Sequence, residues 1–392
     1  MVETSPGGVW TQTWTFQTNP SKNIAQATNR TLDFRLNDYD EASFTLPCKS
    51  AAAAIIDSFA TDLWIWCNDV KVFRGRIVAD NDRKGPNGWT VDCKAISYRG
   101  LLGLRWFWTN NVDMWTDFTP KPVTEVITDL LGYSHESDTV RVTTTEVAGT
   151  PVNLATFFAA RGNRIPTWGA YGGPDTAGPQ GWGIDPSLIP STGPVVSRAY
   201  QSGWTIGDAI DEIFALVGEW SLDPDHKLHL HQPRRGYATE SAPRKLAEPR
   251  HIQEWERSFD AAQYGNWIYG VNGTSDPFVE TQSGYVTPKS IYRGVIGRVV
   301  NFTNLTDLPS VTTQVDKAGN QYSRDGHGWS LVLKPGVWTG PSYVDVGDTI
   351  ALNINGKPRF VASDLACRIT NVHVALADTG PETVTLTAEE NA

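Results

Sequence analysis

The chain of 392 residues is 40% hydrophobic and 19% charged, a balance that excludes a disordered protein and predicts two or three folded domains. Its net charge of −10 argues against sequence-independent binding of nucleic acid, because such binding depends on Lys and Arg displacing counterions from phosphates. No apolar run approaches the roughly 18 residues of a membrane span, and the first residues, MVETSPGGVWTQTWTF, lack the basic and apolar regions of a secretory signal.

Residues 1–105 predict a first β-barrel. Leu32, Phe34 and Leu36 alternate with other residues up to a turn at 37–40, as in a half-buried strand. A two-residue turn, Asn-Asp at 68–69, separates DLWIWC from VKVFRGRIVADNDR, and a Gly-Pro-Asn-Gly turn precedes the next strand. Five or six such strands in succession favour a small antiparallel barrel, since closure leaves no exposed strand edge.

Residues 106–240 predict an α/β domain. One helix is expected in PKPVTEVITDLLGY, where apolar residues recur at helical spacing, and a second helix is expected after Thr205. Thr205 is the expected N-cap of the second helix, with Asp208 three residues later, and Gly218 is its expected end. The apolar stripe of this helix consists of Ile206, Ile210, Ile213, Phe214 and Val217.

Between these helices, residues 161–203 predict a long arm rich in Gly, Pro and aromatic residues. Such a long segment without periodicity is uncommon in a compact protein and is usually functional or disordered. Trp168, Tyr171 and Trp182 favour an arm that contacts a neighbour, because solvated linkers rarely carry such side chains.

Residues 241–392 return to strand patterns and predict a second β-barrel with the closing strands. The Asn-Gly pair at 355–356 lies between two apolar runs and indicates a hairpin. The four cysteines, at positions 48, 67, 93 and 367, form no CxxC pair. We expect reduced, buried thiols, with a Cys67–Cys93 disulfide as the alternative.

The segment DPDHKLHLHQPRRG carries His226, His229 and His231, which raises the question of a metal site. On a strand, His229 and His231 share one face and could chelate zinc, but a third ligand is not apparent, since His226 lies in the preceding turn. The competing hypothesis is a hairpin of EWSL with LHLH, in which the leucines face the core and the histidines face water or a neighbouring subunit. We favour the hairpin and expect no bound metal or cofactor.

Signals for catalysis are weak. There is no GxSxG elbow, and the glycine-rich YGGPDTAGPQGWG lacks the ending of a phosphate-binding loop. Candidate carboxylates for a glycoside hydrolase, although the sequence alone places no two of them together, are Glu219, Asp223, Glu254 and Glu256. We therefore predict that the chain is not an enzyme and has no catalytic residues.

The chain resembles the hub proteins of phage tail tips and baseplates in three segments. These are DLWIWCNDVKVFRGRIVADNDRKGPNGWTVDCKAISYRGLLGLR, YQSGWTIGDAIDEIFALVGEWSLDPDHKLHLHQP and CRITNVHVALADTGPETVTLTAE. The family includes the N-terminal part of tail-associated lysins and the spike-bearing hubs of contractile systems, and many members are called minor tail proteins. The resemblance spans about 30–235 and 345–390, and it depends on the order and spacing of short motifs such as FRGRI and YRGLL.

This resemblance implies two barrel domains with an inserted α/β domain, in a ring-shaped homotrimer whose six barrels match the sixfold tail tube. It implies a distal tail protein above, the C-terminus of the tape-measure protein inside, and a tip fibre or receptor-binding protein below. An acidic channel would let phage DNA pass without specific binding. The implied location is the tail tip of the virion, after assembly in the host cytoplasm and without membrane insertion.

Three arginines are candidate contact residues of such a ring. Arg74 and Arg76 flank Gly75 in a predicted strand, and Arg99 precedes Gly100. We expect these arginines near subunit contacts, with solvated strand arginines as the alternative.

The sequence thus predicts a structural hub of a siphophage tail tip, which joins the sixfold tube to the threefold tip and lines the DNA exit channel. The alternative is a carbohydrate-binding or glycan-hydrolysing tail protein that recognises the receptor, motivated by the Trp-rich loops. The sequence ends at Ala392 without the peptidase or lysozyme domain of many tail-associated lysins, so we expect no lytic role.

Overall fold

The structure is a computed structural model, and it is mainly β. It describes residues 12–18, 22–59, 61–86, 88–104, 115–123, 125–127, 130, 145–147, 150–152, 195–201, 204–259, 265–271, 280–284, 296–301, 308–322, 327–354, 365–378 and 380–390. The arm at 161–203, with Trp168, Tyr171 and Trp182, lies almost entirely outside these residues, as does the Asn-Gly pair at 355–356. None of the helices in the described part of the chain is long and apolar enough to cross a membrane.

Thirteen strands form one large sheet, in the order β15-β19-β22-β21-β3-β4-β7-β6-β5-β1-β2, with β20 paired to β21 and β14 paired to β20. The N-terminal strands are β1 (Trp14–Thr18), β2 (Lys22–Asn23), β3 (Thr28–Arg35), β4 (Glu41–Pro47), β5 (Asp62–Cys67), β6 (Val70–Gly85) and β7 (Gly88–Ser97). The C-terminal strands are β14 (Arg244–Ala247), β15 (Ile252–Phe259), β19 (His327–Leu333), β20 (Thr349–Asn353), β21 (Leu365–Leu376) and β22 (Thr383–Glu390).

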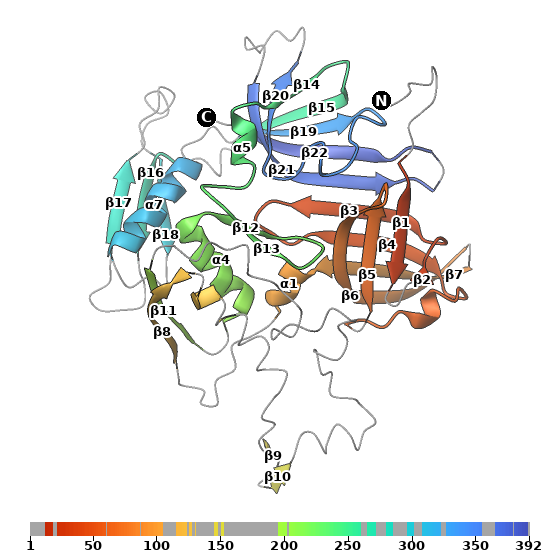
Figure 1. Ribbon diagram of the computed structural model, residues 1–392, viewed down its shortest axis with the longest axis horizontal. Coiled ribbons are helices and arrows are strands. Elements are labelled where there is room, and N and C mark those ends of the chain that lie inside the picture. Colours follow the sequence, from red (N-terminus) through yellow and green to blue (C-terminus); the bar gives the residue numbers. More distant parts are fainter. Residues whose placement is uncertain are drawn as a thin grey trace.

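β3 and β21 join the two halves of this sheet. They pair antiparallel, with Leu32 opposite Val374 and Phe34 opposite Val372, and all four side chains are buried. The buried side chains of both halves form one hydrophobic core. The predicted β structure is confirmed, but the expectation of two separate barrels is not, because one sheet and one core run through both regions. In Figure 1 the C-terminal strands lie directly above the N-terminal strands.

Local sequence determines the tight connections within the sheet. Asn68 and Asp69 both have positive φ, 51° and 64°, which is the backbone of a type I′ hairpin turn and is tolerated by Asn and Asp. Gly75 allows β6 to approach β7, since a Cβ at this position would lie 2.3 Å from the carbonyl oxygen of Ile96. The short η1 (Ala53–Ile55) lies between β4 and β5, and α1 (Tyr98–Leu102) follows β7.

The predicted α/β region contains the two expected helices. Residues 123, 125–127 and 130 are helical, and α4 spans Ile206–Val217. The Asp208 N–H donates to the Thr205 hydroxyl at 3.0 Å, so the predicted N-cap is confirmed. The other elements here are β8 (Trp115–Pro122) paired with β11 (Val195–Gln201), β9 (Thr145–Val147) paired with β10 (Thr150–Val152), and the hairpin of β12 (Glu219–Leu222) and β13 (Leu228–His231).

A second α/β unit interrupts the C-terminal strands, where the sequence predicted only barrel strands. After α5 (Tyr237–Glu240), β14 and β15 come β16 (Trp267–Val271), β17 (Glu280–Gly284), β18 (Gly297–Asn301) and α7 (Leu308–Tyr322). These three strands form their own sheet, with β16 in the centre and parallel to β18. Ile268, Val311 and Val315 are its buried core. α7 contacts α4, so this unit extends the α/β region, at the left of Figure 1.

The four cysteines are free thiols, and Cys67, Cys93 and Cys367 are buried. Burial raises the pKa of each of these three thiols to about 12. A thiol with such a pKa is protonated at neutral pH and behaves as a small hydrophobic side chain, as predicted.

Candidate functional site

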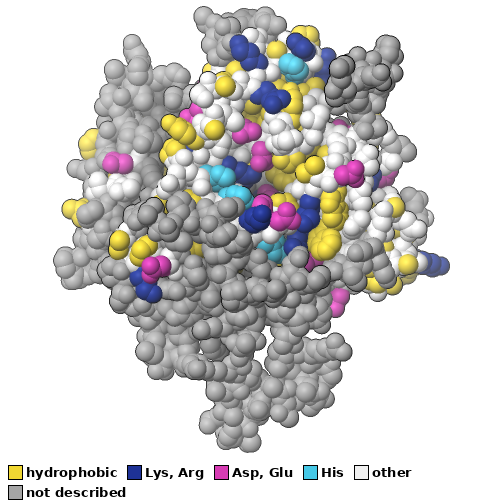
Figure 2. Space-filling model, in the orientation of Figure 1, with side chains coloured by type: hydrophobic (Ala, Val, Ile, Leu, Met, Phe, Trp, Pro, Cys, Tyr) yellow, Lys and Arg dark blue, Asp and Glu magenta, His cyan; other side chains and the backbone are white. Residues whose placement is uncertain are grey.

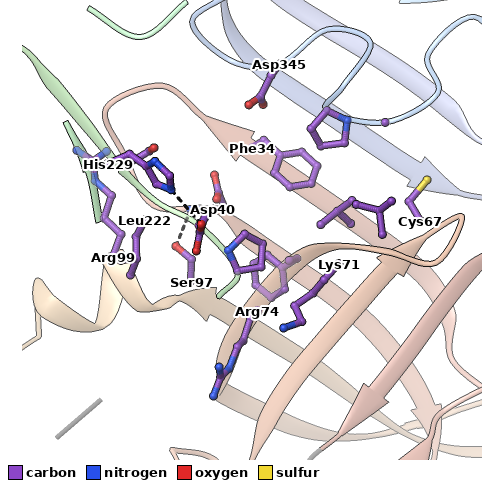
Figure 3. A pocket seen from close by; sticks show the side chains of 18 of the residues that line it. Phe34, Asp40, Cys67, Lys71, Arg74, Ser97, Arg99, Leu222, His229 and Asp345 are labelled. Atoms are coloured by element: carbon purple, nitrogen blue, oxygen red, sulfur yellow. Dashed lines mark hydrogen bonds and ion pairs between the residues drawn. The ribbon is translucent and has the colours of Figure 1, made fainter. Parts of the chain in front are cut away.

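A cleft lies where the N-terminal strands, the β12–β13 hairpin and the C-terminal strands meet. Its volume is about 410 Å³, and its walls come from the β3–β4 turn, β6, α1, the hairpin and the loop at 339–345. Figure 2 shows charged and histidine side chains gathered around a hollow at the centre of this face. In Figure 3, Asp40, Arg74, Ser97 and His229 line the cleft from four different segments.

The β12–β13 hairpin forms one wall and has the predicted register. Trp220 pairs with Leu230 and Leu222 pairs with Leu228, which is fully buried. His229 and His231 therefore share one face, with ring centroids 6.2 Å apart. They line the cleft inside the chain, whereas the sequence suggested an outer surface. Contact of these residues with a neighbouring subunit stays a prediction.

Each histidine of the hairpin has a local role. His229 Nε2 lies 2.9 Å from Asp223 Oδ2, and His231 Nε2 lies 2.8 Å from Ser221 Oγ. His226 sits in the turn with φ of 64°, and its buried ring packs 4.0 Å from the ring of Tyr98. In the described part of the chain, no group of three His, Cys, Asp or Glu residues is arranged to hold a metal ion.

A buried ion pair lies below the cleft. The Arg76 Nε donates to Asp62 Oδ1 at 2.9 Å, and the Tyr98 hydroxyl donates to Asp62 Oδ2 at 2.9 Å. Arg76 also donates to the Tyr98 hydroxyl at 3.1 Å, so three side chains satisfy one another. Burial and the neighbouring Asp62 raise the pKa of Tyr98, which keeps its hydroxyl protonated.

The structure rejects the alternative of solvated strand arginines for Arg74 and Arg76, which are 7% and 1% exposed. The guanidinium of Arg74 lies 5.5 Å from the ring of Trp64 and 5.7 Å from that of Tyr98, a cation–π arrangement at the wall of the cleft. Whether these arginines lie near a subunit contact stays a prediction. Their pairing inside the chain was not predictable, because Asp62 has no distinctive local pattern.

Arg99 connects the N-terminal strands to the α/β region. Its guanidinium donates to Asp211 Oδ1 at 2.8 Å and to the Trp220 carbonyl at 2.9 Å, and it lies 4.2 Å from the Trp220 ring. The Trp220 indole N–H donates to the same carboxylate at 2.6 Å. Arg99 thereby fixes α1 against both α4 and β12.

Glu219 connects the hairpin to the C-terminal strands. Both of its oxygens accept hydrogen bonds from the Arg368 guanidinium, and it also accepts from the Arg235 backbone N–H at 2.9 Å. Arg235 in turn donates to Asp345 at 2.6 Å. Burial opposes ionisation of Glu219, but Arg368 outweighs it and lowers the pKa of this carboxyl. Such bidentate, charge-assisted pairs hold a fixed orientation.

Two groups in the cleft have displaced pKa values. Burial raises the pKa of Asp40 to about 6, although Arg235 and the Arg35 backbone N–H oppose this effect. Burial, Arg235 and His229 together lower the pKa of His231 to about 4. At neutral pH the cleft therefore contains an uncharged His231 and a mostly ionised Asp40.

The candidate hydrolase carboxylates have positions that favour structural roles. Glu219 is held by Arg368, and Asp223 accepts the backbone N–H groups of Asp225 and Lys227 at the hairpin turn. Glu254 and Glu256 lie exposed on β15, away from the cleft lining. Glu219 and Asp223 thus fix the position and the turn of the hairpin.

Comparison with known proteins gives structural matches only. No protein-family model matches the chain, and no curated protein matches its sequence. A tail protein from Neisseria meningitidis MC58 matches with a TM-score of 0.62 and 12% identity, over 97% of each chain. The 43 kDa tail protein of prophage MuSo2 from Shewanella oneidensis matches with a TM-score of 0.57 and 8% identity, over 96% of this chain and 98% of that one.

A third solved structure, prophage tail protein gp18 from Listeria monocytogenes EGD-e, matches with a TM-score of 0.51 and 11% identity. It covers 97% of this chain and 94% of the gp18 chain. At these identities the matches show a shared fold. The chain therefore has the fold of phage tail proteins along nearly its whole length.

Proposed function

We propose that the chain is a structural subunit of a phage-type tail, located at the tail tip as a hub. The observation that carries this proposal is the match to three tail proteins over nearly the full length of both partners. Fold alone does not determine function. The proposal therefore also draws on the hub-like motifs FRGRI and YRGLL, which here lie in β6 and α1 beside the cleft.

The internal connections suit a rigid building block. One core runs through both halves of the sheet, and ion pairs of Arg99 and Arg368 attach the α/β region to each half. In the proposed hub, three subunits form a ring that joins the sixfold tube to the threefold tip. Each subunit would contribute two strand regions to a pseudo-sixfold wall.

The proposed neighbours are a distal tail protein, the C-terminus of a tape-measure protein and a tip fibre or receptor-binding protein. At −10 per chain, three copies carry a formal charge of −30, which favours passage of DNA through the ring without binding. The proposed role is structural and includes no reaction.

Two measurements on purified material test this role. Mass spectrometry of purified tails is expected to find the chain, and light scattering of the isolated protein is expected to give about 129 kDa, three times the 43.1 kDa chain. A monomer that is absent from tails and that binds or cleaves cell-wall glycan would contradict the proposal and favour the receptor-recognition alternative.

A further inference from the structure

A smaller cavity lies where the first strands of the chain meet the turn between β21 and β22. Its volume is about 220 Å³, and its walls consist mainly of polar groups. The lining includes Trp14 of β1, Arg30 of β3, and Ala377, Gly380 and Glu382 of the turn. None of these residues lines the larger cleft described above. The cavity is therefore a separate feature, at the junction of the two halves of the large sheet.

Glu382 is the unusual residue of this cavity. It is 6% exposed, and its Oε1 atom is buried and makes no hydrogen bond within the described part of the chain. The buried carboxylate of Asp62, by contrast, is held by Arg76 and Tyr98. A buried carboxyl oxygen costs free energy unless new hydrogen bonds replace those that it made with water. Glu382 therefore needs a hydrogen-bond donor that the described residues do not supply.

Two hydrogen-bond donors in the walls of the cavity are in the same situation. The Nε1 of Trp14 and the Nε of Arg30 are buried and, among the described residues, make no hydrogen bond. Other contacts fix both side chains. The Trp14 ring stacks on Trp338 with ring centroids 6.2 Å apart, and the Nη2 of Arg30 donates to the Ala377 carbonyl at 3.2 Å. Three side chains that line one cavity thus have one unbonded acceptor and two unbonded donors.

This mixture of donors and acceptor limits what the cavity can hold. The Arg30 guanidinium disfavours a cation, and the Glu382 carboxyl group disfavours an anion. An apolar molecule would leave all three polar atoms without partners. Sites for organic ligands are lined mainly by apolar and aromatic side chains and enclose roughly 300–1,000 Å³. This cavity is smaller and its lining is mainly polar, so an organic ligand is disfavoured as well.

We propose that this cavity binds a cluster of ordered water molecules, which connects Glu382 to Arg30 and Trp14. Water both donates and accepts, so the cluster donates to Glu382 Oε1 and accepts from Trp14 Nε1 and Arg30 Nε. One water molecule needs about 10–15 Å³ of accessible cavity volume, so a cavity of about 220 Å³ holds several. A bridging water is enthalpically nearly as good as a direct hydrogen bond, which removes the cost of the three buried atoms.

The water cluster joins the two halves of the large sheet. Trp14 and Arg30 belong to N-terminal strands, whereas Glu382 directly precedes the C-terminal strand β22. Arg30 lies opposite Leu376 in the pairing of β3 with β21, and its bond to Ala377 is a direct contact with the same turn. The waters add an indirect contact between these elements. This inference concerns the isolated chain and does not depend on the proposed role in a tail.

A high-resolution crystal structure of the full chain tests the proposal. Ordered waters are expected at hydrogen-bond distance, about 2.7–3.2 Å, from Glu382 Oε1, Arg30 Nε and Trp14 Nε1. A closed cavity in which Glu382 contacts Arg30 directly would overturn the proposal. An organic molecule or protein atoms in the cavity would also overturn it, as would a cavity that contains no ordered water.

Two double-mutant cycles provide a second readout in solution, the equilibrium constant of unfolding from chemical denaturation. Arg30→Met is combined with Glu382→Leu in one cycle and with Glu389→Leu, at an exposed position of β22, in the control cycle. Loss of the Arg30 bond to Ala377 is common to both cycles and cancels. In the first cycle the combined effect is expected to differ from the product of the single effects by about threefold or more, and in the control cycle to equal it. Coupling no larger than that of the control would contradict the proposal.

Discussion

The 13-stranded sheet and the small β17-β16-β18 sheet differ in the size of the core that supports them. One continuous core runs through the large sheet, whereas the described core of the small sheet consists of three fully buried side chains. A large core lets a region keep its shape without a partner. The small sheet packs on α7, which contacts α4 of the α/β region. The first region is thus the frame of the molecule, and the second is a small unit attached to it.

The largest expected effect lies in the frame, at the buried ion pair. Arg76→Met would leave the Asp62 carboxylate, 2% exposed, without its main partner. We expect the free energy of unfolding to fall by roughly 3–5 kcal/mol, measured by chemical denaturation. Arg83→Met is the control, since the Arg83 side chain is 73% exposed. A loss no larger than that of the control would show that the frame does not depend on this network.

Leu32→Ala tests whether the two halves of the sheet unfold together. Leu32 is fully buried on β3 opposite Val374 of β21, so its truncation leaves a cavity at the junction, with an expected cost of about 2–5 kcal/mol. Denaturation followed by both fluorescence and far-UV circular dichroism is expected to give one coincident transition, shifted as a whole. Two separate transitions would mean that the halves are independent domains after all. Leu308→Ala, at a residue that is 51% exposed, is the control.

A variant of Asp40 tests whether burial of its charge in the cleft destabilises the fold. The pKa of Asp40 is about 6 in the folded chain and 3.8 ordinarily, so protonation of its carboxyl stabilises the folded state. This contribution is complete below pH 3.8 and is lost as the pH rises through about 6. Asp40→Asn keeps an acceptor for the Arg35 N–H, and it is expected to raise the free energy of unfolding by roughly 1–2 kcal/mol at neutral pH.

The same variant is expected to give no gain at about pH 4, where Asp40 is already protonated in the folded state. Unfolding curves at several pH values measure the difference. A gain that is independent of pH would show that burial of the Asp40 charge is not its cause.

The smallest expected effect lies in the α/β region. Thr205→Ala removes the hydroxyl that accepts the Asp208 N–H at the start of α4, at a cost of about 1 kcal/mol. Thr205→Ser retains this acceptor and is expected to restore stability. If both variants behave alike in thermal unfolding, the cap contributes nothing, and the packing of the Ile210 and Phe214 stripe alone holds the helix.

The sequence predicted elements whose determinants are local. The α4 stripe with its Thr205 cap and the turn at Asn68 are encoded within a few residues, and both are confirmed. The pairing of β3 with β21 joins segments some 340 residues apart, and no local periodicity specifies it. The α7 helix was missed although Val311 and Val315 have helical spacing, because the surrounding alternation favoured strands.

In the candidate site, too, only features with local determinants were predicted from the sequence. The register of the hairpin around His229 followed from alternation, but the partners of its neighbours did not. Glu219 pairs with Arg368 and Arg76 with Asp62 only after the chain has folded. Charged residues carry no pattern that identifies a distant partner, so the cleft could not be assembled from sequence.

Imaging of the tail tip by cryo-electron microscopy tests the central proposal most directly. The proposal predicts three copies of the chain in one ring at the tip, with the 13-stranded sheets in the ring wall. A tail whose tip density does not accommodate this fold, or that contains the chain in sixfold layers along the tube, would contradict it.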